Sequence, residues 1–129
     1  MTTTIYEERI IETVKKVMPA TVSIVVGKDY EALLRERPYE LMIPHGDHVD
    51  LPPPEEELPH TPGGKIRIGG GSGFIVEENG LVLTNKHVVH DPQAEYIVTT
   101  AAEDSYPAKV LARDPLNDVA ILKIEAEDL

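Results

Sequence analysis

Apolar residues near the start of the chain recur at three- and four-residue spacing, the pattern of an amphipathic helix over residues 4–18. Thr4 followed by Glu7 fits a capping box, and Pro19 ends the helix because a residue before proline disfavours helical geometry. The apolar stripe consists of Tyr6, Ile10, Val14, Val17 and Met18. We interpret the helix as a packing element. A membrane anchor is the alternative, but the polar face is not strongly basic.

The next two segments contrast in composition. Residues 20–27 are rich in β-branched side chains and lie between Pro19 and Gly27, which predicts a strand. Residues 28–65 contain seven of the 11 prolines and an acidic run at 55–57. A short helix can form over 30–37, and the rest is predicted to be a long loop, a feature that is often functional in compact domains.

A regular alternation of short apolar runs and turn residues begins at Gly73. Asn79-Gly80 separates the first two of these runs and is a strong hairpin signal. An irregular or helical turn is expected over 85–91, and the tail 125–128 is expected to be exposed. The predicted strands cover residues 20–27, 73–78, 81–84, 95–100, 106–113 and 119–124. Short strands without long helices between them predict a mainly all-β fold, an antiparallel barrel or sandwich.

Two polar residues stand where apolar strands meet turns. His87 follows an apolar strand, and Asp118 immediately precedes another. A neutral imidazole in such a position can accept a proton from a nucleophile. A carboxylate that accepts the other ring N–H would hold the tautomer and stabilise the imidazolium. Spacing alone leaves open the alternative of a turn histidine and a strand-capping aspartate.

The residues around this pair form two motifs. The first is GSGFIV (71–76), followed by the hairpin and by LTNKHVV (83–89). The second is DPLNDVAILK (114–123). Their order and separation resemble the HtrA (DegP-like) family of chymotrypsin-fold serine proteases. The earlier helix that runs into PATVSI (19–24), and the long loop that follows, are also similar to that family.

The resemblance implies a fold of two six-stranded barrels with the catalytic triad between them. Residues 1–129 would be the first, N-terminal barrel, with an N-terminal helix at 1–19 and a long variable loop at 28–65. His87 matches the family's general base, and Asp118 matches its orienting aspartate. The family needs no cofactor, cleaves unfolded or misfolded polypeptides, and often forms homo-oligomers (trimers) and carries a PDZ domain.

The sequence departs from the family in its serines. Ser23, Ser72 and Ser105 are the only ones, and none lies in a Gly-x-Ser-Gly-Gly context. We therefore expect the nucleophile and the oxyanion hole to come from a second barrel that is missing here, and we expect this chain to be inactive alone. The alternative is a non-catalytic β-barrel module for binding or assembly, a degenerate protease half. A nucleophile motif encoded beyond Leu129 would favour the first hypothesis, and a stop codon the second.

Composition excludes several partners. A net charge of −11 argues against nucleic acid, since phosphate binding needs clustered cations. No stretch has the length of a membrane-spanning helix, and no cysteine can form a disulfide.

Residues 1–4 lack the features of a signal peptide, while the resemblance points to the periplasm or cell envelope. An unpartnered apolar face would favour a dimer or higher oligomer.

Three further motifs contain residue types that are typical of binding sites. HGDH (45–48) and His60 match no standard zinc spacing, so no metal site is predicted and His48 and His60 are interpreted as solvated loop residues. The glycine run 69–73 is followed by neither a helix nor a Gly-Lys-Ser/Thr element, so it is not a phosphate-binding loop. His90 is interpreted as a surface turn residue.

Overall fold

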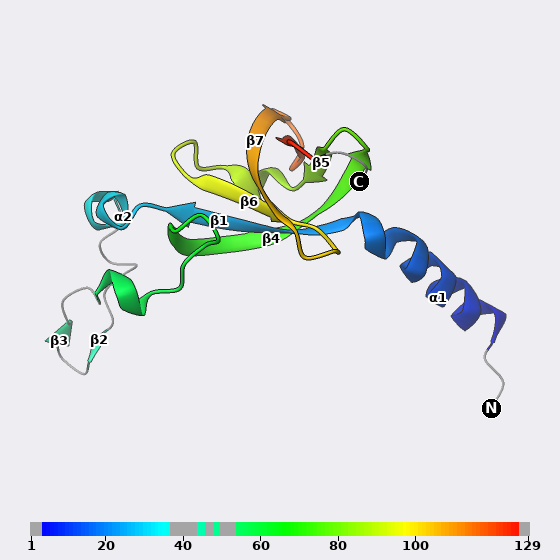
Figure 1. Cartoon of the computed structure of the whole chain (residues 1–129), viewed down its shortest axis with the longest axis horizontal. Coiled ribbons are helices and arrows are strands. Elements are labelled where there is room, and N and C mark those ends of the chain that lie inside the picture. The colour runs from blue at the N-terminus through cyan, green and yellow to red at the C-terminus, as the bar shows by residue number, and fades with distance from the viewer. Residues whose placement is uncertain (1–3, 37–43, 46–47, 50–53, 127–129) are drawn as a thin grey trace.

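Six strands form a closed antiparallel barrel in the computed structural model, which describes residues 4–36, 44–45, 48–49 and 54–126. The strands follow one another around the barrel in the order β1-β4-β5-β8-β7-β6 (Figure 1). They are β1 (Thr21–Lys28), β4 (Ile66–Glu77), β5 (Leu81–Thr84), β6 (Glu95–Thr99), β7 (Ser105–Arg113) and β8 (Ala120–Ile124). The predicted mainly-β class, the barrel and the N-terminal helix are confirmed.

The interior of the barrel is aliphatic. Along β8, Ala120, Leu122 and Ile124 are buried and alternate with half-buried neighbours, the period-two pattern of a strand with one face in the core. β-Branched residues from β1, β5 and β6 complete the interior. The barrel residues with essentially no exposure are Ile24, Val82, Val89, Val98, Leu122 and Ile124. Burial of these side chains supplies the main favourable free energy of folding.

Strand β4 is longer than the sequence predicted. It begins at Ile66 rather than at residue 73, because the glycine run pairs with β1 along its length. A Cβ on Gly70 would lie 2.8 Å from the carbonyl oxygen of Ile24, and one on Gly73 would lie 2.7 Å from that of Leu83. The glycines therefore allow two backbones to approach closely, and their low strand propensity is outweighed by the ladder.

The N-terminal helix α1 (Ile5–Val17) forms within the predicted range, and the Thr4 side chain accepts a hydrogen bond from the Glu7 amide at 3.1 Å. The short 3₁₀ turn η1 (Met18–Ala20) connects it to β1. None of the residues of α1 is buried, so its apolar stripe is not covered by the described part of this chain and its role as a packing element stays a prediction. Figure 1 shows α1 extending away from the barrel, which the six strands close without the helix. No helix within the described ranges is long and apolar enough to span a membrane.

The predicted long loop contains local structure. The helix expected over 30–37 is present as α2 (Tyr30–Glu36), and its Leu33 packs with Ile66 in a small second core. The hairpin of β2 (Pro44–His45) and β3 (His48–Val49) and the turn η2 (Glu55–Glu57) follow. Figure 1 shows α2 and this hairpin on the side of the barrel opposite to α1. Residues 37–43, 46–47 and 50–53 lie outside the described residues.

Candidate functional site

One register brings the two candidate residues together. Strands β5 and β8 are antiparallel neighbours in which Thr84 is opposite Ala120. Thr84 ends β5 and Ala120 begins β8. His87 follows the first of these residues by three positions, and Asp118 precedes the second by two. His87 and Asp118 therefore lie at the same end of the barrel, next to the ends of adjacent strands.

His87 lies in η3 (Lys86–Val89), a 3₁₀ turn directly after β5. The amide of Val88 closes the turn by donating to the carbonyl of Asn85 at 3.1 Å. Val89 is fully buried and Val88 is half-buried against the core, so the two valines hold the inner side of the turn. The imidazole stays on the outer side, and 71% of the His87 side chain is exposed.

Asp118 stands at the end of a tight loop between β7 and β8. Asp114 organises this loop, because its Oδ1 accepts from the amides of Leu116 at 2.8 Å and Asn117 at 2.9 Å. The Asp114 amide donates to the carbonyl of Val119 at 2.9 Å and closes the base of the loop. Local side-chain-to-backbone bonds of this type replace regular structure at turns. They direct the Asp118 carboxylate toward η3.

The Asp118 carboxylate binds His87 through both oxygens. Its Oδ1 accepts from the backbone amide of His87 at 2.8 Å, and its Oδ2 lies 2.5 Å from Nδ1 of the ring. An ionised carboxylate only accepts hydrogen bonds, so Nδ1 carries a proton. In the neutral ring, Nε2 then has a lone pair that can accept a proton from a nucleophile.

The electrostatics of the pair favour the charged carboxylate. The pKa of Asp118 lies below its usual value, mainly because the His87 backbone amide donates to the carboxylate. The hydrogen bond from the imidazole and the positive charge of Lys86 act in the same direction. A carboxylate that stays ionised keeps the ring oriented and can stabilise a positive charge on it.

Three further contacts join η3 to the segment around Asp118. Lys86 Nζ donates to the carbonyl of Asp114 at 2.7 Å, and Asn85 Nδ2 donates to the carbonyl of Asp118 at 3.2 Å. Arg113 donates to the carbonyl of Val89 through Nε at 2.9 Å and through Nη2 at 2.7 Å. Sequence reasoning did not single out these roles. Asn85 and Lys86 lie within the quoted motif, and Arg113 directly precedes the second one.

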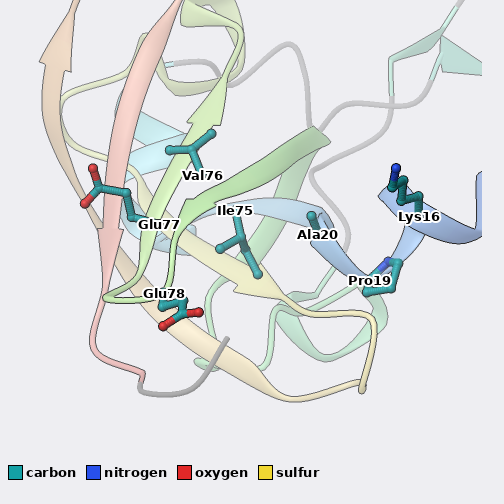
Figure 2. A pocket seen from close by; sticks show the side chains of 7 residues that line it. All are labelled: Lys16, Pro19, Ala20, Ile75, Val76, Glu77 and Glu78. Atoms are coloured by element: carbon teal, nitrogen blue, oxygen red, sulfur yellow. The ribbon is translucent and has the colours of Figure 1, made fainter. Parts of the chain in front are cut away.

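Small hollows flank the pair. One of about 160 Å³ is lined by His87, Val88 and His90 together with residues of β1 and β4. Another, of about 140 Å³, is lined by Asp118, Val119 and Phe74, among others. A third, of about 240 Å³, lies beside η1 and is lined by Lys16, Pro19, Ala20, Ile75, Val76, Glu77 and Glu78 (Figure 2). The third shares no lining residue with the first two, so the hollows relevant to His87 and Asp118 are the smaller ones.

The other sequence candidates do not join this site. Ser23, Ser72 and Ser105 lie in β1, β4 and β7, and no hydrogen bond in the described part of the chain links a serine hydroxyl to His87. His90 is exposed, as expected, and its Nδ1 donates to the His87 carbonyl at 2.6 Å.

Among the described residues, no cluster of three or more His, Cys, Asp or Glu side chains that could hold a metal ion forms. The described residues therefore provide no metal-binding cluster for the histidines of the long loop. Asp47 of the HGDH motif lies outside the described residues, and the side chains of His45 and His48 are not described.

Comparison with known proteins identifies the family. The model of the trypsin-like peptidase domain family matches residues 71–129, the part that contains both candidate residues. A probable periplasmic serine endoprotease DegP-like of Brucella suis is 32% identical over 135 residues, covering 88% of this chain and 26% of that protein. The chain is similar to the DegP-like serine endoproteases, and its residues 71–129 match the trypsin-like peptidase domain family. The resemblance seen in the sequence motifs is thereby confirmed.

Other DegP-like relatives have a higher sequence identity to this chain over a shorter stretch. The protein with the same name from Ectopseudomonas mendocina is 44% identical over 75 residues, covering 57% of this chain and 16% of that protein. The one from Pseudomonas putida is 48% identical over 59 residues, covering 46% of this chain and 12% of that protein. The chain thus spans about a quarter or less of the length of the DegP-like proteins it matches.

Proposed function

We propose that this chain supplies the general base His87 and the orienting carboxylate Asp118 of a serine endopeptidase that hydrolyses peptide bonds in unfolded polypeptides. The observation that carries the proposal is the two-point contact between His87 and Asp118. A capping aspartate would need only the backbone bond. The second bond, to Nδ1, sets the ring tautomer that a general base requires.

In the proposed reaction, Nε2 of His87 removes the proton from a serine hydroxyl as the serine oxygen attacks the scissile carbonyl carbon. Asp118 stays ionised and stabilises the imidazolium that forms. His87 then gives the proton to the leaving amine as the carbon–nitrogen bond breaks. In the second half of the cycle His87 takes a proton from the water that attacks the acyl-enzyme, and returns it to the serine oxygen as the acyl–oxygen bond breaks. No cofactor enters these steps.

The serine and the oxyanion hole come, in this proposal, from a second barrel that packs beside the first. Residues 1–129 would then be the N-terminal barrel, with the helix at 1–19 and the variable loop at 28–65. The exposure of the pair supports this, since 71% of the His87 side chain and 49% of the Asp118 side chain are exposed. Phe74 and Val119, which line the hollow beside Asp118, are also exposed. Covering them would exclude water and strengthen the electrostatic interactions of the site.

This chain alone is expected to be inactive, because it would lack the nucleophile and half of the cleft. The test compares peptide hydrolysis by the 129-residue chain with hydrolysis by a longer protein that joins it to a second barrel. The His87→Ala change should abolish turnover in the longer protein, whereas His60→Ala, at an exposed histidine of the long loop, should retain it as the matched control. Turnover by the isolated chain above its own His87→Ala variant would contradict the proposed division of the site.

A role in binding or assembly is the second candidate, favoured by the exposed apolar residues of α1. Ile5 and Tyr6 are each more than two-thirds exposed, and Ile10, Val14 and Val17 are also exposed. Such a surface favours association, so we expect a homo-oligomer. Light scattering on the chain, and on a Tyr6→Glu/Val14→Glu variant, tests this expectation. A monomer at high concentration before the substitutions would contradict it.

The names of the relatives bear on location, since the Brucella and Ectopseudomonas proteins are both named periplasmic. We propose an extracytoplasmic site for the protein that contains this chain. Fractionation of cells that express it from its own gene tests the proposal, and recovery with cytoplasmic markers would contradict it.

A further inference from the structure

A lysine is buried next to the segment that carries His87. Lys28 ends β1, and only 3% of its side chain is exposed. Its Nζ donates to Oδ2 of Asp91 at 2.8 Å and also to Oε2 of Glu36. The pKa of Lys28 is raised, first by the hydrogen bond to Asp91 and then by the one to Glu36, so the ammonium stays charged between two carboxylates.

Asp91 connects the Lys28 ammonium to the segment that carries His87. It follows His87 by four residues and the turn η3 by two, and its side chain is buried. Its Oδ1 accepts from the Gln93 amide at 2.9 Å. Its carbonyl accepts from the Tyr96 hydroxyl at 2.5 Å, so β6 holds the same residue. Asp91 therefore ties the end of the His87 segment to both β1 and β6.

The segment from His87 to Asp91 is therefore bonded to the barrel at three successive places. Asp118 binds the backbone amide of His87 at its start, Arg113 binds the carbonyl of Val89 in its middle, and Lys28 binds Asp91 at its end. Lys28 acts from the β1 side of the barrel, whereas Asp118 and Arg113 act from the β7–β8 side. Contacts with both β1 and the β7–β8 part of the barrel restrain rotation of the turn.

Stability alone is a weak reason for such a buried charge. Desolvation of two ions offsets much of their attraction, and apolar replacements of buried pairs are often as stable or more stable. In some proteins, buried ionic groups instead fix a unique arrangement of the groups that they join. Here the group joined to Lys28 is Asp91, two residues after the turn that carries the imidazole.

We propose that Lys28 is a positioning residue for His87: its buried ammonium holds Asp91 and thereby sets the orientation of the turn that presents the imidazole to Asp118. The inference rests on the proposed role of His87. It extends that role to a residue at the end of β1 that makes no contact with the reacting atoms. Glu36, on α2, is the second anchor of the same ammonium.

The test uses the 129-residue chain and does not depend on peptidase activity. The Lys28→Met/Asp91→Leu double variant replaces the pair with apolar groups of similar size. We expect a folded protein in which the His87 amide exchanges with solvent about tenfold faster, because its bond to Asp118 opens more often. NMR titration should also show the pKa of Asp118 closer to its usual value. A folded double variant with unchanged His87 exchange and Asp118 titration would overturn the proposal.

Two controls separate positioning from general stability. Lys65→Met breaks the exposed ion pair with Asp29, which does not touch η3, and should leave His87 exchange unchanged. Ile124→Val shortens a fully buried residue of β8 and should lower the unfolding midpoint without changing His87 exchange. If His87 exchange rises as much in Ile124→Val as in the Lys28 variant, the effect is general and the proposal fails.

The isosteric Asp91→Asn variant covers the case in which the double variant does not fold. It keeps the side-chain volume and an acceptor while removing the charge that holds Lys28. We expect a change in the same direction, and unchanged His87 exchange in this variant would also overturn the proposal. Loss of activity on His87→Ala in the longer protein remains a separate test, so failure of either proposal can be recognised without the other.

Discussion

His87 is bound to Asp118 at two points, by its backbone amide at 2.8 Å to Oδ1 and by its ring Nδ1 at 2.5 Å to Oδ2. The backbone contact places the carboxylate, and the ring contact places the imidazole on it. Because one carboxylate makes both contacts, a shift of the turn η3 changes the ring geometry directly. The position of η3 relative to the Asp118 carboxylate is therefore as important for the ring geometry as the two side chains themselves.

Replacing Asp118 with asparagine should remove the charge while keeping the shape. In the longer protein with a second barrel, we expect kcat to fall by about 10³–10⁴-fold, because an amide can present N–H to the ring and favour the wrong tautomer. Peptide hydrolysis measures this. Asp104→Asn, in the exposed turn after β6, is the control and should be neutral. A loss of less than about tenfold for Asp118→Asn would argue against its proposed role.

Acid should destabilise the chain through Asp118 and Asp114. Both pKa values are lowered, chiefly by backbone amides that donate to the carboxylates: His87 to Asp118, and Asn117 followed by Leu116 to Asp114. The folded state therefore binds fewer protons than the unfolded state. The stabilisation is fully present above the unfolded pKa of about 3.9 and is lost as the pH falls through the folded value.

Urea unfolding at a series of pH values from about 6 to about 2.5 measures this loss. The Asp114→Asn/Asp118→Asn variant should show a flatter dependence of the unfolding free energy on pH over the acid part of the range. An equally steep dependence in the variant would assign the acid effect to other carboxylates.

Gly71 should be needed for the position of His87. A Cβ on Gly71 would lie 2.6 Å from a methyl carbon of Val88, the neighbour of His87. We expect Gly71→Ala to cost about 2 kcal/mol of unfolding free energy, through overpacking, and to alter the amide resonance of His87. Gly69→Ala is the matched control, because no atom lies within 4 Å of its added Cβ. Equal effects of the two substitutions would contradict the steric argument.

The unfolding free energy should depend far more on Leu122, in the barrel core, than on Leu116, in the loop between β7 and β8. Leu122 is 0% exposed and Leu116 is 90% exposed. We expect Leu122→Ala to lower the unfolding free energy by about 3 kcal/mol, from lost burial and the cavity left behind. Leu116→Ala should change it by less than about 0.5 kcal/mol. Chemical denaturation of the two variants measures both values.

Removal of residues 1–16 should leave the barrel intact, since no residue of α1 is buried. We expect the unfolding midpoint to change by less than about 4 °C, the shift that 1 kcal/mol produces in a domain of this size. Thermal unfolding followed by circular dichroism measures it. A larger drop at low protein concentration would mean that α1 packs on the barrel in solution.

Much of the local structure could be predicted from the sequence. The apolar spacing with Thr4 at its start predicts α1, and Asn79-Gly80 predicts the β4–β5 hairpin, where Gly80 has a φ of +98° that favours glycine. The start of β4 was misplaced because its glycines have low strand propensity, and only their partner β1 makes the ladder. The surface that covers α1 could not be predicted, since an apolar stripe does not say which surface packs on it.

The sequence by itself determined the barrel class, the family and the identity of His87 and Asp118 as candidates, because short-range patterns and motifs are written in consecutive residues. Only the tertiary structure decided that the two residues meet, that Arg113 bonds to Val89 and that Lys28 bonds to Asp91. The physical reason is that Thr84 and Ala120 pair across a ladder, and Lys28 reaches Asp91 across 63 positions of sequence. Contacts of that range arise only when the closed barrel brings distant strands together.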